Sequence, residues 1–312
     1  MQVMEVARLK PRPEGRGGCQ LTANQYCLSG QPQPLTVVTR SDLLVAILAG
    51  IVQGIVEWLP VSSQGNLSLV LTLVGTEPDI AIQLALFLQV GTTLSAVTYY
   101  QREIKTVLAT IPGWRPQTAY DGDNAIASYL VIASFMTGLV GIPLYILAVD
   151  VAGQLTGGIF IAGIGVLLVG TGLLQLASES FSQAHHTDPT FTDSLLVGAV
   201  QGIAILPGVS RSGMTTSAFL FRSYEPSAAF RLSFLLSIPA SLGAAVLTLL
   251  SAGGLPGISP TAALVALSVS AIVGYLTIDA VMRVVERIPF WAVCFGLGGL
   301  AIVGGGIVSI VV

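Results

Sequence analysis

The sequence predicts an all-α membrane protein built as an inverted repeat, in which each half contains one re-entrant helix hairpin and three transmembrane helices. The first observation is composition: 53% of the 312 residues are hydrophobic, 9% are charged, and the mean hydropathy is +0.82. An ordinary soluble fold cannot keep so much apolar surface from water. The second observation is a pair of similar segments, 53–65 and 201–213, that carry the most deeply placed charges. We therefore expect the bilayer, and no nucleic acid, as a partner.

Six stretches are long enough to cross a bilayer as helices, since a helical span needs about 20 apolar residues. They lie near residues 80–100, 126–149, 155–176, 229–250, 261–281 and 290–311. Two further apolar regions, 43–75 and 192–221, are too long for one span and are interrupted by Pro, Gly and Ser. If each returns to its own side as a hairpin, the protein has about ten helices and six full spans. Four ordinary spans in place of the two hairpins are the alternative.

The two interrupted regions are copies of one unit, with one residue slipped around the proline. The offset is 148 residues at three matched pairs: Gln53 and Gln201, Val61 and Val209, and Gly65 and Gly213. Three spans per half invert the second half, so the hairpins enter from opposite faces and their tips can meet near the midplane. Paired broken helices of this kind indicate a binding site in the middle of the membrane.

The chain divides into a polar extension and one membrane domain. Residues 1–42 are rich in Pro, Gly and Gln and lack the apolar core of a signal peptide, so we expect them to be disordered. Residues 43–312 form a single integral membrane domain, with repeat 1 at 43–180 and repeat 2 at 190–312.

The distribution of Lys and Arg predicts the orientation. In the hairpin arrangement, the loops 76–79, 150–154 and 251–260 on one side hold no basic residue. The other side holds Arg102, Lys105, Arg115, Arg222, Arg231, Arg283 and Arg287. Short basic loops stay in the cytoplasm, so this second side is predicted to be cytoplasmic and the first hairpin to open outward. The five basic residues of 1–42 argue the other way, because they would have to be translocated.

One pair of charges falls deep within the predicted membrane segments. Arg211 is the only basic residue away from the ends of these segments, and Glu57 is its clearest acidic counterpart, whereas Asp279 lies near a span end. A charge at the bilayer centre costs about 2.5–3.5 kcal/mol even on insertion scales, so it indicates a functional site. The alternative is an ion pair that only locks the two hairpins together.

The residues around this pair indicate an oxyanion site. Ser62 and Ser63 follow Pro60, and Ser210 and Ser212 flank Arg211, so each break is followed by a helix start with free N–H groups, a ready phosphate site. Glycines permit close backbone approach, and the guanidinium of Arg211 suits phosphate oxygens. Close helix packing is the alternative explanation of the small residues. A charged site reached through the membrane favours a lipid substrate.

These segments resemble the undecaprenyl-diphosphate phosphatases of the bacitracin-resistance type, a family with archaeal members. The first family motif corresponds to Gln53-Gly-Ile-Val-Glu57 followed by Pro60-Val-Ser-Ser-Gln-Gly-Asn66. The second corresponds to Pro207-Gly-Val-Ser-Arg-Ser-Gly213, and the stretch 230–239 is also similar. The likeness covers about residues 43–312 and, with two motifs in order, is specific.

The resemblance implies removal of the terminal phosphate from a C55-type polyprenyl diphosphate, at a site that opens to the outer face of the cell membrane. It implies a Mg²⁺ or Ca²⁺ ion, with Glu57 as the candidate ligand, and no organic cofactor. The catalytic residues carried over are Glu57, Ser63 and Arg211. The substrate-binding residues are Gln53, Ser62, Gly65, Asn66, Gly208, Ser210, Ser212 and Gly213.

One position departs from the family pattern, because Asn66 stands where the family has His. Asn can orient a phosphate or a water molecule, but it cannot take up a proton near neutral pH. Glu57 is then the only evident base, and it would activate either Ser63 or a water molecule. Two other function classes stay open: a polyprenyl-phosphate carrier or flippase without hydrolysis, and a scaffold with a structural ion pair. The Gly-rich last span also allows a homodimer.

Overall fold

The computed structural model describes residues 40–122, 124–180, 186–285 and 288–311. The extension predicted at 1–42 therefore lies almost entirely outside the described residues. Within these ranges the chain forms eleven α-helices, two short 3-10 helices and no β-strand. The predicted all-α class is confirmed.

Six of the helices are long and apolar enough to span a membrane. They are α3 (Pro78–Tyr99), α5 (Asn124–Ala152), α6 (Gly157–Glu179), α9 (Pro226–Ser251), α10 (Pro260–Val285) and α11 (Phe290–Val311). Their outer faces carry large apolar side chains such as Phe135, Leu250 and Leu276, which are 69%, 75% and 72% exposed. Apolar surface on this scale is stable against lipid and not against water. The protein is a multi-pass membrane protein, and each span lies within a few residues of its prediction.

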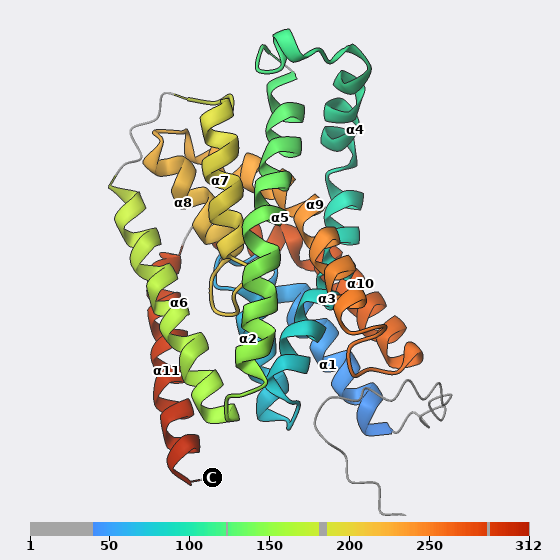
Figure 1. Ribbon diagram of the computed structural model, residues 1–312, viewed down its shortest axis with the longest axis vertical. Coiled ribbons are helices and arrows are strands. Elements are labelled where there is room, and N and C mark those ends of the chain that lie inside the picture. Colours follow the sequence, from blue (N-terminus) through green and yellow to red (C-terminus); the bar gives the residue numbers. More distant parts are fainter. Residues whose placement is uncertain (1–39, 123, 181–185, 286–287, 312) are drawn as a thin grey trace, which may run out of the picture. The chain divides into compact units, whose positions relative to one another are not determined.

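The two interrupted regions are hairpins of short helices. The first consists of α1 (Arg40–Val56) and α2 (Ser63–Leu73), and the second of α7 (Phe191–Ile203) and α8 (Arg211–Phe221). α2 and α8 both contain 11 residues and begin 211 − 63 = 148 residues apart. In Figure 1 the two hairpins enter the bundle from opposite ends, and their breaks lie near its middle.

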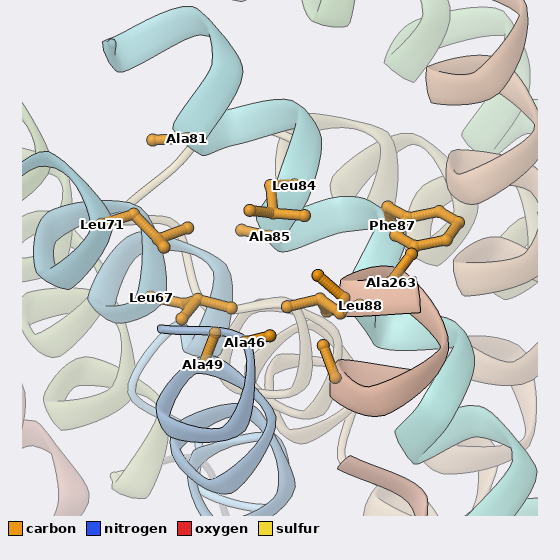
Figure 2. Close-up of a cluster of buried hydrophobic side chains, with 12 residues drawn as sticks. Ala46, Ala49, Leu67, Leu71, Ala81, Leu84, Ala85, Phe87, Leu88 and Ala263 are labelled. Atoms are coloured by element: carbon orange, nitrogen blue, oxygen red, sulfur yellow. The ribbon is translucent and has the colours of Figure 1, made fainter. Parts of the chain in front are cut away.

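Contacts at the open ends of the hairpins show that each returns to its own side. In the second hairpin, Arg222 at the end of α8 forms an ion pair with Asp193 in the first turn of α7 (2.8 Å). In the first, Ala46 of α1 and Leu71 of α2 belong to one buried cluster with α3 and α10 (Figure 2). The alternative of four ordinary spans is therefore excluded.

An eleventh helix, α4 (Gln101–Thr110), exceeds the predicted count of about ten. It follows α3 directly and carries Arg102, Glu103 and Lys105, so it is too short and too polar to span the bilayer. Glu103 forms an ion pair with Arg231 near the start of α9. Length and hydropathy do not predict α4, because a short amphipathic helix at the end of a bundle does not have the apolar length of a span.

The loops without Lys or Arg lie at one end of the helix bundle and the basic loops at the other, as the predicted topology requires. A Cβ at Gly153 would lie 3.9 Å from Asp79 Cβ, and one at Gly257 would lie 2.7 Å from Ile80 Cγ2. The loops without Lys or Arg therefore gather around the start of α3. The opposite end contains α4 and the basic residues Arg222 and Arg231.

Glycines bring the last span against α6. A Cβ at Gly165 would lie 2.6 Å from the carbonyl oxygen of Gly298, and one at Gly158 would lie 2.7 Å from that of Gly305. Only glycine permits helices to approach this closely. Part of the Gly-rich sequence of the last span is thus explained by packing within the chain.

Candidate active site

The breaks in the two hairpins contact each other. The backbone N–H of Gly208 donates to Ser62 Oγ (3.1 Å), and Gln64 Nε2 donates to the carbonyl oxygen of Ile205 (2.9 Å). A Cβ at Gly65 would lie only 2.5 Å from the backbone nitrogen of Gly208. The predicted meeting of the hairpin tips is confirmed, and Gly65 is required for this contact.

A serine caps the helix that follows each break. Ser62 Oγ accepts a hydrogen bond from the N–H of Gly65 (3.2 Å), and Ser210 Oγ accepts one from the N–H of Gly213 (3.2 Å). The earlier N–H groups of both helices find no acceptor within the described part of the chain; they belong to Ser63, Gln64, Arg211 and Ser212. Two helix starts thus offer free donors and the positive ends of their dipoles to an anion.

The two breaks have their positive φ angles at different positions. Ser62 adopts the left-handed region (φ 60°), whereas in the second break the positive φ falls on Gly208 (98°). A non-glycine residue held in this region stores about 1–3 kcal/mol of strain, a feature common at functional sites. A Cβ at Gly208 would lie 2.5 Å from the carbonyl oxygen of Ile164 in α6. Gly208 therefore permits helix packing as well as the turn.

Glu57 is the first residue of the first break, directly after α1, and its side chain is 4% exposed. Its Oε2 atom accepts hydrogen bonds from Ser63 Oγ (2.6 Å) and from Gln53 Nε2 (2.7 Å). A general base must lie within about 2.6–3.2 Å of the atom whose proton it takes. The Ser63 hydroxyl meets this condition in the resting structure, and Gln53 orients the carboxylate.

Arg211 links the second hairpin to Glu57 and to two spans. Its Nη2 atom pairs with Glu57 Oε1, and its Nη1 atom donates to Ser241 Oγ in α9 and to Gln89 Oε1 in α3 (3.3 Å). Ser241 also donates to Gln89 (3.2 Å). In the sequence the Glu57–Arg211 ion pair was an alternative to a phosphate-binding role, and neither Gln89 nor Ser241 was predicted to contact Arg211. A glutamine within an apolar span was the available signal for Gln89, while Ser241 is one of many serines.

A cavity of about 60 Å³ lies beside the ion pair, with room for several water molecules. Both helix starts line it, together with Gln89, Thr137 and Gln201. A smaller cavity of about 30 Å³ shares Glu57 and Arg211 and extends toward the start of α9. The ion pair therefore stands between two cavities.

The structure separates the predicted site residues into two groups. Six of them line the larger cavity: Glu57, Ser62, Ser63, Ser210, Arg211 and Ser212. Five lie behind it: Gln53, Gly65, Asn66, Gly208 and Gly213. Asn66 Nδ2 donates to the carbonyl oxygens of Val61 (2.7 Å) and Ser62 (2.9 Å), so it holds the break from behind.

The donor set around the cavity bears on a divalent cation. Among the described residues, no group of three His, Cys, Asp or Glu side chains can hold a metal ion. Glu57 is the one carboxylate in the cavity lining, and Arg211 already pairs with it. Gln201 Oε1 is buried without a hydrogen-bond partner and adds a neutral oxygen. This set fits a Mg²⁺ ion whose other ligands are phosphate oxygens of a substrate and water molecules. It does not fit a Mg²⁺ site in which the protein supplies all the ligands.

Comparison with known proteins relates the sequence to a protein family. The family described as bacitracin resistance protein BacA matches residues 46–300. The chain is 48% identical over 271 residues to the undecaprenyl-diphosphatase of Haloarcula marismortui, covering 86% of this chain and 100% of that protein. It is 38% identical over 274 residues to the undecaprenyl-diphosphatase of Methanococcoides burtonii, covering 84% and 97%. The undecaprenyl-diphosphatase of Saccharolobus solfataricus is 34% identical over 271 residues, covering 84% and 95%.

Proposed function

Because the chain belongs to the bacitracin resistance protein BacA family, we propose that it hydrolyses undecaprenyl diphosphate to the monophosphate and inorganic phosphate. The monophosphate is the lipid carrier used in envelope glycan assembly. The observation that supports this reaction most directly is the hydrogen bond from Ser63 Oγ to Glu57 Oε2 (2.6 Å) beside two helix starts with free N–H groups.

The first step is attack by Ser63 on the terminal phosphorus. Glu57 takes the proton from Ser63 Oγ as the Oγ–P bond forms, the anhydride P–O bond breaks, and the polyprenyl monophosphate leaves with the electron pair. Glu57 passes this proton to the departing monophosphate. A water molecule then attacks the phosphorus of the phosphorylated Ser63 and the Oγ–P bond breaks. Glu57 accepts the proton of the water molecule and returns it to Ser63 Oγ as inorganic phosphate leaves. These two reaction steps need no histidine, which agrees with Asn66 at the motif position.

Charge neutralisation comes from Arg211 and the two helix starts. Gln89 and Ser241 hold the guanidinium so that it stays at the cavity when the diphosphate competes with Glu57 for it. Phosphoryl transfer depends chiefly on such positioning and on stabilising the charge of the transferred group. A Mg²⁺ or Ca²⁺ ion bound with the substrate would neutralise further charge, with Glu57 as its carboxylate ligand.

The orientation follows from the two ends of the bundle. The end with α4, Arg222 and Arg231 is assigned to the cytoplasm by the excess of basic residues there. Entry of the substrate from the outer side of the cell membrane is part of this proposal, and the family resemblance supports it. A homodimer also stays a prediction, based on glycines of α11 that face open space, such as Gly299 and Gly306.

Phosphate release by the purified protein in detergent tests the proposal. Glu57→Gln and Arg211→Ala should each lower kcat/KM for undecaprenyl diphosphate by about 100-fold or more, since each removes a base or a charge acting on the reacting group. Glu225→Gln and Arg102→Ala change exposed charges outside the site and serve as matched controls. Equal rates in all four variants would contradict the assignment.

A carrier is the second candidate, because the Glu57–Arg211 pair separates two cavities along α9. A carrier would bind the lipid phosphate and move it across the bilayer without releasing phosphate. Lipid binding by the parent protein with no phosphate release would therefore favour the carrier over the enzyme.

A further inference from the structure

An apolar groove lies behind the second break and is separate from the polar cavity. It has a volume of about 450 Å³ and is lined by apolar side chains and one glycine, contributed mainly by the end of α5 and the start of α6. Its floor is buried, with Ile82 0%, Ile164 2% and Phe160 4% exposed. Its rim is open, because Val151 and Val166 are 42% and 59% exposed.

The groove adjoins the polar cavity along two paths. On α3, Ile82 lines the groove and Leu86 lines the cavity. These residues are one turn apart on the same helix face, a rise of about 6 Å. One turn further, Gln89 contacts Arg211. α3 therefore presents a strip that runs from an apolar groove to the guanidinium.

The second path is the break itself. Ile205 lines the cavity, whereas Leu206 and Pro207 line the groove. Ile205 also packs in one buried cluster with Ile82 and Ile164, two residues of the groove floor. The turn that presents Ser210 and Arg211 to a phosphate thus has the groove on its other face.

From this continuity we propose that the groove between α5 and α6 holds the isoprene units that follow the first unit of the polyprenyl chain, while the diphosphate lies in the polar cavity. This inference rests on the proposed function and adds the binding site of the lipid tail. The groove runs from the break toward the loop that joins α5 to α6, and its exposed rim lets the rest of the tail leave into the apolar core of the bilayer.

Gly163 allows the groove to be filled without disturbing the fold. It lines the groove, and a Cβ there would meet nothing within 4 Å. Gly170 lies seven residues further along α6, also has open space at its Cβ, and is outside the groove lining. Gly163→Phe and Gly170→Phe are therefore matched variants, and both replace glycine inside a helix by a better helix former.

The test compares a long substrate with one too short to reach the groove. For undecaprenyl diphosphate, Gly163→Phe should lower kcat/KM about tenfold, because the displaced tail misplaces the phosphate. For the C5 compound dimethylallyl diphosphate, kcat/KM should stay within about twofold of the parent. Gly170→Phe should resemble the parent with both substrates. Equal losses on both substrates in Gly163→Phe, or no loss on either, would overturn the proposal.

Photolabelling separates this result from failure of the proposed function. Undecaprenyl monophosphate with a diazirine near its head should label α6 in the parent and in Gly170→Phe, and should label Gly163→Phe much less. Labelling of α6 by a diazirine phospholipid alone would mean that bilayer lipid occupies the groove, and would overturn the proposal. If the parent releases no phosphate from either diphosphate, the enzyme assignment fails, whereas this labelling still decides on the groove.

Discussion

Ser62→Ala should destabilise the protein more than Ser210→Ala, although the two serines occupy equivalent positions in the two repeats. Ser62 Oγ accepts hydrogen bonds from the N–H groups of both Gly65 and Gly208, whereas Ser210 Oγ accepts only that of Gly213. Both serines are buried, at 4% and 1% exposed. A buried donor left without a partner costs about 1–3 kcal/mol. We expect losses of about 3 kcal/mol for Ser62→Ala and about 1.5 kcal/mol for Ser210→Ala.

Thermal unfolding in detergent, followed by circular dichroism, measures the difference. At roughly 2–4 °C per kcal/mol, the Tm of Ser62→Ala should lie about 3–6 °C below that of Ser210→Ala. Alanine keeps the Cβ of Ser62 and hence the strain of its left-handed backbone, so the comparison isolates the hydroxyl group. Equal Tm values would refute the idea that this hydroxyl joins the two hairpins.

Three further predictions concern residues around the site and at the end of the second hairpin. Burial alone would raise the pKa of the Asp193 carboxyl, but hydrogen bonds from Thr190, Tyr224 and Arg222 outweigh it and hold the pKa below its ordinary value. This stabilisation is present above the unfolded pKa of about 3.9 and is lost as pH falls through the folded pKa. Asp193→Asn should therefore lower the Tm at pH 7, and the Tm of this variant should decline less steeply than that of the parent below about pH 4. A pH profile of the Tm that is unchanged by the substitution would contradict this. Asn66→Ala should lower the free energy of unfolding by about 1–2 kcal/mol, because two backbone carbonyls lose their donor. Asn66→His should leave the rate of phosphate release within about twofold of the parent, since Asn66 lies behind the cavity. A large gain in rate would show that the imidazole acts on the substrate. A chelator should lower phosphate release, and added Mg²⁺ should restore it. Calorimetry should detect Mg²⁺ binding only with a substrate analogue present. Tight binding of Mg²⁺ to the protein alone would contradict the inference that Glu57 is the one carboxylate ligand.

The spans and hairpins were predictable because they depend on local properties of the chain. Length and hydropathy place a helical span within a few residues, and a proline such as Pro60 or Pro207 interrupts an apolar run at a definite position. The constant offset of 148 residues then identified the second hairpin from the first. α4 escaped prediction since its charged residues fit no membrane pattern and its position depends on an ion pair with α9.

The clustering of the candidate site residues was predictable, but the contacts of each atom were not. The motif predicts Ser62 and Ser210 as phosphate ligands, and the structure shows their oxygens serving as helix caps. The partners of Arg211 could not be predicted, because Gln89 and Ser241 are separated from it by 122 and 30 residues and meet it only through the packing of α3 and α9. Such contacts are set by tertiary packing, and no periodic signal in one segment encodes them.

The repeat is symmetric in its framework and asymmetric in its chemistry. Both hairpins contain a glutamine, a break and a capped helix start. Ser63 in the first corresponds to Arg211 in the second, since 211 − 63 = 148, and Glu57 corresponds to Ala204, each three residues before the proline. A carboxylate and a hydroxyl thus come from one half and the guanidinium from the other. Because neither tip alone has all three groups, the ion pair and the hydrogen bond from Gly208 to Ser62 assemble the site as well as the fold. Substitutions that separate the tips, such as Gly65→Ala, should therefore reduce turnover and stability together, whereas those that alter only charge should reduce turnover first.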